Sequence, residues 1–338
     1  MRRAPLSTFK RTISICGLLL LALLGIVTVA SLFGSERLPL LNSLCALTGR
    51  SNCGLSAEQQ AILYEIRLPR VSLAGVVGMC LAAAGAGYQS LLRNPLAEPY
   101  LLGVSNGAAV GTMLAMVFFG AHEWSRPLLA FGGAIIASAV VYQLARGRAG
   151  ATPDRLILAG VIVTTFLSSA IVFLTVLMDA TRIRSFTFWL LGDLSGTSGR
   201  LLTMALIGVV IGVVVLMFTA RSLNLMMLGE RDAFDLGVEV GRIRLLVFLA
   251  ASVLVGSSVA ASGSVGYVGL VVPHLVRLSF GSDNRMVIPA SALAGASFVI
   301  VADTLARTLI APRELPVGAI TALIGAPLFI YLLRRGSN

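Results

Sequence analysis

The residues that could carry out chemistry are few in this sequence and lie far apart. Lys10 is the only lysine, and no glycine-rich loop precedes it, so the chain has no P-loop, in which a lysine contacts the phosphates of ATP. His122 and His274 have no cysteine or acidic residue at ligand spacing, which gives a metal centre no support. H-E-x-x-H does not occur, and G-x-S-x-G occurs once, at residues 103–107, within an apolar run rather than after a strand. We therefore expect no catalytic residue, no metal and no cofactor in this chain.

The four cysteines divide into two pairs. Cys45 and Cys53 share a polar stretch between two apolar runs and could close a small disulfide ring in an oxidising compartment. Two free thiols are the alternative. Cys16 and Cys80 lie within apolar runs, where cysteine is usually a small apolar residue.

The composition shows what kind of elements must position these groups. Hydrophobic residues make up 57% of the chain, charged residues 12%, and the mean hydropathy is +0.92. Soluble domains usually carry about 25% charged residues, so lipid rather than water must surround this chain. The net charge of +11 comes from arginines clustered between apolar runs. That is the pattern of cytoplasmic loops in membrane proteins, so we expect no nucleic-acid partner.

The apolar runs predict an all-α polytopic membrane protein, with residues 1–338 forming one transmembrane domain. The expected helices are about 13–33, 68–91, 99–119, 127–145, 155–178, 200–219, 243–263, 267–281, 286–310 and 317–334. We interpret the first run as a retained helix, because it is longer than the apolar core of a signal peptide. Ten helices, and basic residues at both termini, place both ends of the chain in the cytoplasm.

Acidic residues avoid these runs, with one exception. Asp303 lies within an apolar run, four residues before Arg307, and we expect the two to pair near the outer face. Carboxylates in the centre of a span mark ion-coupled carriers, because burying them is costly without a role. Their scarcity argues against a carrier driven by protons or sodium.

A faint internal repeat appears at an offset of 178 residues. It aligns Ala82, Ala83 and Gly85 with Ala260, Ala261 and Gly263, and continues through Leu92, Pro95, Gly103 and Asn106 to Leu270, Pro273, Gly281 and Asn284. The two copies would cross the membrane in opposite directions, as in transporters built from inverted repeats. Chance matching of small residues is the alternative.

Several motifs together resemble the FecCD-type permeases, the membrane subunits of importers for ferric siderophores, haem and cobalamin. They include Arg67-Leu-Pro-Arg70, Arg93-Asn-Pro-Leu-Ala-Glu-Pro99, Gly266-Tyr-Val-Gly-Leu-Val-Val-Pro-His-Leu-Val-Arg277 and Glu314-Leu-Pro-Val-Gly318. They occur in order from about residue 60 to the end. The resemblance implies the type II ABC importer fold, with ten helices per subunit. It also implies a homodimer, two cytoplasmic ATPase subunits that bind ATP and Mg, and an extracytoplasmic binding protein.

The inner segment 221–241 resembles the family's coupling helices, which lie in a groove of the ATPase. The residues assigned to this contact are Leu225, Leu228, Gly229, Glu230, Arg231, Asp232, Phe234, Asp235, Leu236 and Gly237. Leucines and phenylalanine would enter the groove, and the charged residues would set the register. A solvated connector is the alternative, but a connector would not need so many large apolar residues.

The resemblance also assigns sites at both ends of the channel. Arg67, Arg70 and Arg307 match positions that pair with glutamates of the binding protein, for which the planar guanidinium group is suited. Arg67 and Arg70 could instead be interfacial anchors. Residues matching the cytoplasmic gate are Asn94, Leu96, Thr152 and Asp154. Pro153 departs from the family pattern, and Asn94-Pro95 could simply end a helix.

These observations predict a permease subunit of an ABC importer in the cytoplasmic (inner) membrane that carries a metal chelate. An iron siderophore or haem is favoured over cobalamin, because iron chelates are the commonest cargo of the family. The alternatives are a secondary transporter driven by an ion gradient, or a membrane enzyme or sensor built around Asp303 and Arg307.

Overall fold

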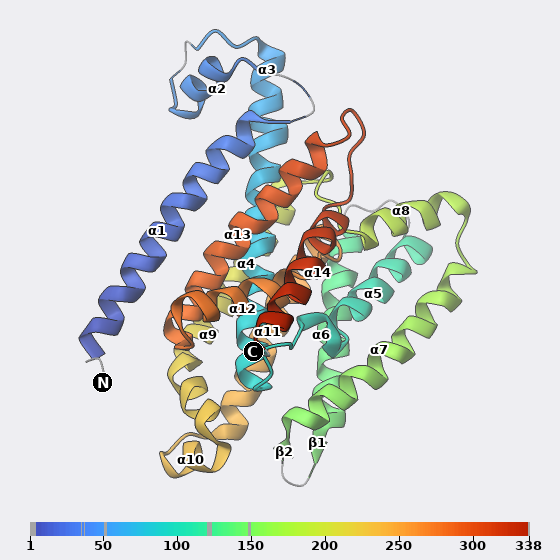
Figure 1. Cartoon of the computed structure of the whole chain (residues 1–338). Helices are drawn as coiled ribbons and strands as arrows, with labels where there is room; N and C mark the ends of the chain where they lie inside the picture. The colour runs from blue at the N-terminus through green and yellow to red at the C-terminus, as the bar shows by residue number, and fades with distance from the viewer. Residues whose placement is uncertain are drawn as a thin grey trace.

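In the described part of the chain, ten helices cross or enter the bundle in the order that the apolar runs predict (Figure 1). The computed structural model describes residues 5–34, 36, 38–50, 53–119, 124–147 and 150–336. The ten helices are α1 (Pro5–Leu32), α4 (Leu68–Leu91), α5 (Val104–Phe118), α6 (Ser125–Ala145), α7 (Pro153–Thr175), α9 (Gly199–Leu228), α11 (Val240–Ser262), α12 (Val268–Phe280), α13 (Asn284–Thr308) and α14 (Val317–Gly336).

Short elements connect them. The helical ones are α2 (Leu40–Leu47), α3 (Ala57–Ala61), the π-helix η1 (Ile62–Arg67), the 3-10 helix η2 (Pro99–Leu102), α8 (Ala180–Leu190) and α10 (Glu230–Asp235). Two-residue strands β1 (Arg146–Gly147) and β2 (Gly150–Ala151) pair antiparallel.

Helix α5 is shorter than the predicted span 99–119, whereas α12 and α14 lie within two residues of their predicted limits. Within the described residues, seven helices are long and apolar enough to cross a membrane, whereas α5, α12 and the apolar part of α14 are shorter. The predicted span 99–119 is interrupted at Gly103, and α12 begins directly after Tyr267. Both residues have left-handed backbones, with φ of +78° and +67°, which cannot continue a right-handed helix.

The centre of the bundle is α4, which is almost wholly buried against α11, α13, α9 and α12. Glycines allow this close packing. A Cβ atom at Gly78 of α4 would come within 2.1 Å of the Gly295 carbonyl oxygen of α13, and one at Gly85 within 1.9 Å of the Gly269 carbonyl oxygen of α12. Close backbone approach through small residues is how helices associate where lipid removes the usual hydrophobic drive.

The bundle has two distinct ends (Figure 1). We call the end that carries α2, α3 and α8 the cap end. The opposite end carries α10 and the β1–β2 hairpin, and the chain also begins there. Helix α1 runs from the α10 end to the cap end along the outside of the bundle, with exposed leucines along its length.

The opposite directions that the proposed repeat predicts are found for α4 and α11. These helices pack side by side and run in opposite directions, as the inverted alignment predicts. From Gly85 onward the offset of 178 is wrong. It equates Gly85, inside α4, with Gly263, which follows α11, and Pro95, in a turn, with Pro273, inside α12. It likewise equates Gly103, which precedes α5, with Gly281, which follows α12. The connection after α4 is longer than the one after α11, so a fixed offset cannot follow both.

Candidate functional sites at the two ends of the bundle

The short helix α10 presents large apolar side chains outward from its end of the bundle. Leu228, Phe234 and Leu236 are 72%, 70% and 64% exposed, whereas Ala233 is fully buried and holds α10 against the bundle. Gly237 ends the turn with φ of +85°, and the Val238 amide donates to the Ala233 carbonyl oxygen at 2.9 Å. The segment is therefore a compact, anchored element with an apolar outer face, suited to a groove on a partner.

The other residues assigned to this contact divide between the outer face and the bundle. Arg231, Asp232 and Asp235 are exposed. Leu225 belongs to α9, which continues to Leu228, and it packs against the core rather than joining the exposed apolar face. Glu230 also turns towards the bundle, where Arg244 and Arg93 contact its carboxylate. Part of the segment 221–241 is thus a rigid extension of a long helix instead of a loop.

The predicted gate residues lie in two connections of different structure. Asn94 Oδ1 accepts a hydrogen bond from the Leu96 amide at 2.9 Å, which fixes the turn after α4 and leaves Leu96 partly exposed. Thr152 is the N-cap residue of α7, with no hydrogen bond from its side chain to the helix, and Asp154 is exposed in the first turn. Their role as a gate stays a prediction.

At the cap end, a buried cluster of charges joins α4 to α13. Asp303 contacts Arg70 Nε at 3.0 Å and Arg307 Nε at 2.9 Å, and its side chain is 1% exposed. Glu314 adds a second carboxylate to Arg70, at 2.7 Å from Nη1. The predicted pairing of Asp303 with Arg307 is confirmed, but the contact with Arg70, 233 residues earlier, could not be seen in the sequence.

The three arginines assigned to docking are buried within this chain. Arg67, Arg70 and Arg307 are 3%, 7% and 3% exposed. Arg67 donates to the backbone carbonyl oxygens of Ser31, Leu32 and Glu36, and so fixes the end of α1. Docking stays a prediction. In this conformation Arg70 could meet a partner carboxylate only where Glu314, which is partly exposed, leaves or shares its guanidinium group.

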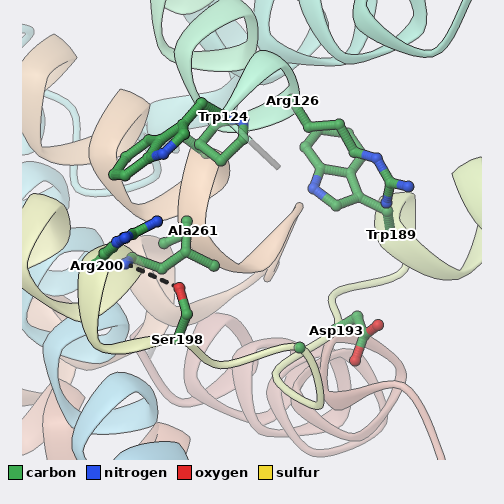
Figure 2. Close-up of a pocket in the computed structure, with 11 residues that line it drawn as sticks. Trp124, Arg126, Trp189, Asp193, Ser198, Arg200 and Ala261 are labelled. Carbon is green, nitrogen blue, oxygen red and sulfur yellow. Dashed lines mark hydrogen bonds between the residues drawn. The ribbon is translucent and has the colours of Figure 1, made fainter. Parts of the chain in front are cut away.

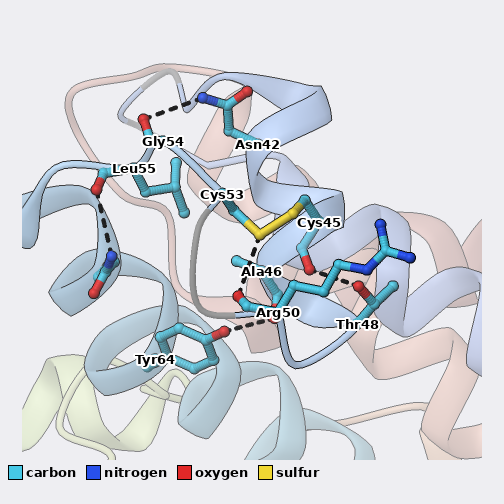
Figure 3. The surroundings of a disulfide bond; sticks show 10 residues. Asn42, Cys45, Ala46, Thr48, Arg50, Cys53, Gly54, Leu55 and Tyr64 are labelled. Atoms are coloured by element: carbon cyan, nitrogen blue, oxygen red, sulfur yellow. Dashed lines mark hydrogen bonds between the residues drawn. A yellow bond between two sulfur atoms is a disulfide. The ribbon is translucent and has the colours of Figure 1, made fainter.

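The structure joins Cys45 and Cys53 in a disulfide, with their Cα atoms 5.6 Å apart (Figure 3). The Tyr64 hydroxyl donates to the Ala46 carbonyl oxygen at 2.7 Å, and Asn42 Nδ2 donates to the Gly54 carbonyl oxygen at 3.1 Å. These contacts fasten the disulfide loop to η1, which leads into α4. The disulfide loop is therefore held in place on one side of the cap end.

We expect a thiol-specific reagent to modify two of the four cysteines when the protein is unfolded without reductant, and all four after reduction. The reactive pair should be Cys16 and Cys80, identified by peptide mass spectrometry. Protein with Cys45 replaced by serine should show a third reactive thiol at Cys53. Modification of all four cysteines before reduction would contradict the disulfide.

A cavity of about 350 Å³ also opens at the cap end, between α6, α8, α9 and α11 (Figure 2). Both tryptophans of the chain, Trp124 and Trp189, line it together with Arg126 and Arg200. The Arg200 guanidinium group lies 5.3 Å from the centre of the Trp124 ring, a cation–π distance. The sequence does not indicate that Trp124 and Trp189 lie together, because they are distant along the chain.

Metal ligands do not gather in the described part of the chain, where no group of three or more histidine, cysteine or acidic side chains could hold an ion. His274 lies in α12 with its ring 6.2 Å from that of Phe329. His122 lies outside the described residues.

Comparison with known proteins identifies the family. The FecCD transport family matches residues 19–335. The cobalamin import system permease protein BtuC of Halobacterium salinarum is 43% identical over 83% of this chain and 75% of its own length. The hemin transport system permease protein HmuU of Yersinia pestis is 42% identical over 81% and 83%. A solved structure, described as an inward-facing conformation of a metal-chelate type ABC transporter, superimposes with a TM-score of 0.85.

That solved structure is 31% identical and covers 95% of this chain and 99% of its own. The chain is thus a mainly helical, multi-pass membrane protein with the fold of ABC importer permeases. It belongs to the FecCD transport family.

Proposed function

We propose that this chain is the membrane-spanning permease subunit of a binding-protein-dependent ABC importer that moves a metal chelate into the cytoplasm. The observation that carries the proposal is the segment around α10, in which Leu228, Phe234 and Leu236 form an exposed apolar face at one end of a membrane bundle. Such a face is unfavourable in water, and its charged neighbours make it unsuited to lipid. Both features fit a groove on a soluble partner.

The partner at the α10 end would be an ATPase, which binds and hydrolyses ATP with Mg. The sequence has no P-loop of its own. By the family's arrangement, two such subunits serve two copies of this chain in the inner membrane. The α10 end and both termini then face the cytoplasm.

The partner at the cap end would be an extracytoplasmic binding protein that delivers the chelate. A disulfide at this end suits an oxidising compartment. The arginines Arg67, Arg70 and Arg307 lie at the same end, with Glu314 as the carboxylate that a docking glutamate would have to displace. The channel between two copies would open to each side in turn, as ATP binding and binding-protein docking shift a two-state bundle.

The cargo is a chelated metal, with an iron siderophore or haem favoured over cobalamin. Relatives named for cobalamin and hemin import are almost equally similar to this chain, and the Fe(3+)-citrate import system permease protein YfmD of Bacillus subtilis is 38% identical over 83% of it. The shared feature of these cargoes is a metal ion held by an organic ligand.

Uptake into liposomes tests this function. The permease would be purified with the ATPase that binds it, reconstituted, and supplied with its binding protein and with haem, ferric citrate or cobalamin in separate samples. We expect uptake of one cargo class only with ATP on the α10 side and the binding protein on the other. Uptake by the permease alone along an ion gradient would instead establish a secondary transporter.

A further inference from the structure

One carboxylate on α10 connects this helix to both predicted gate segments. Glu230 is the first residue of α10, and its Oε1 atom lies 3.3 Å from Arg93 Nη2 and 2.5 Å from Arg244 Nη2. Arg93 directly precedes Asn94 in the turn after α4. Arg244 comes from α11, and its other terminal nitrogen donates to the carbonyl oxygen of Ala151, which directly precedes Thr152.

The arm through Arg244 is buried and rigid. The Arg244 side chain is 4% exposed, and its two terminal nitrogens contact Glu230 on one side and the Ala151 backbone on the other. A planar guanidinium group with both ends engaged keeps the distance between its two partners constant. The β2 strand, which ends at Ala151, therefore cannot move independently of α10 while this contact holds.

The arm through Arg93 has an unusual backbone. Arg93 has φ of +49°, a left-handed conformation that helix ends normally give to glycine or asparagine. An arginine there accepts a backbone strain that glycine would avoid. Its side chain reaches Glu230, so the strained residue places a positive charge between the gate turn and α10.

We propose that Glu230 is the positioning residue that transmits movement of α10 to both gate segments, through Arg93 to the Asn94–Leu96 turn and through Arg244 to the start of α7. This inference rests on the proposed contact between α10 and an ATPase. A single carboxylate shared by two arginines couples the segments more tightly than two separate ion pairs, since both arms must move with the same atom. The apolar face of α10 binds the partner, while Glu230 carries the movement inward.

The test uses the permease assembled with its ATPase in lipid nanodiscs, with Leu96→Cys or Thr152→Cys as a reporter and Cys16 and Cys80 replaced by alanine. The maleimide labelling rate of each reporter is measured without nucleotide and with ATP and vanadate. We expect the parent complex to change its rate at both reporters by about fivefold or more, the lower range of allosteric coupling. In Glu230→Gln complexes that purify with the ATPase, the nucleotide-dependent change should disappear at both reporters.

Two further variants complete the test. One removes only the Arg93 contact with Glu230, and the other controls for the loss of a carboxylate at this end of the bundle. Arg93→Gly keeps the left-handed backbone and removes one arm, so the response should disappear at Leu96→Cys and persist at Thr152→Cys. Glu239→Gln removes a carboxylate that is 74% exposed at the same end, and it should respond like the parent complex.

Each result bears on a definite claim. An assembled Glu230→Gln complex, or an Arg93→Gly complex, whose reporters respond as in the parent would overturn the relay and leave the proposed function standing. Should the parent permease fail to bind the ATPase, or bind it with no response at either reporter, the proposed coupling falls, and the relay with it.

Discussion

Replacing Leu228 and Phe234 by aspartate is expected to release the ATPase from the membrane. Each side chain is at least 70% exposed in the free permease, so its burial in a groove would contribute about 1.5–3 kcal/mol. Loss of both corresponds to a decrease in affinity of roughly 100-fold or more, before the cost of burying two new charges. Co-purification of the tagged permease with the ATPase measures this decrease in affinity directly.

Leu41→Asp is the matched control for this pair. Leu41 is 81% exposed, but it lies on α2 at the opposite end of the bundle. The variant should therefore bind the ATPase as the unmodified protein does. A complex that survives purification with aspartate at both 228 and 234 would count against α10 as the coupling element.

Replacing Asp303 by alanine is expected to destabilise the permease strongly. The change leaves Arg70 and Arg307 buried without their shared carboxylate, and removing one partner of a buried ion pair costs about 3–5 kcal/mol. At the sensitivity usual for proteins of 150–250 residues, the midpoint of thermal unfolding in detergent should fall by roughly 10 °C. Size-exclusion chromatography of heated samples measures this midpoint.

Glu314→Gln is the control for that change. Glu314 is partly exposed, and Arg70 keeps Asp303 when the second carboxylate loses its charge, so the loss of stability should be much smaller. Equal midpoints for Asp303→Ala and the unmodified protein would contradict the buried cluster. Charge reversal at Arg67, Arg70 and Arg307 tests docking of the binding protein only if the variant is first shown to be folded.

The sequence predicted the order and approximate limits of the ten helices, because apolar length and basic flanks are local properties. It also predicted the Asp303–Arg307 pair, whose spacing is that of one helical turn. The sequence did not predict contacts between distant segments. Arg70 with Asp303, and Glu230 with Arg93, depend on how α4, α11 and α13 pack, which no single segment encodes.

The assignment of Leu225 to a partner surface stays a prediction, although α9 continues through it and it packs partly against the core. One error in the sequence interpretation has a local physical cause. The span 99–119 was predicted as one helix because hydropathy does not register backbone conformation. The left-handed residue Gly103 divides that segment into η2 and α5.

The proposed function requires α10 to face the cytoplasm and the disulfide loop to face the other side of the membrane. Asp235→Cys on α10 and Thr181→Cys on α8 would be labelled with a membrane-impermeant maleimide, with Cys16 and Cys80 replaced by alanine. We predict labelling at 235 only in inside-out vesicles and at 181 only in right-side-out vesicles. Labelling of both from one side, or of 235 from outside, would contradict the account.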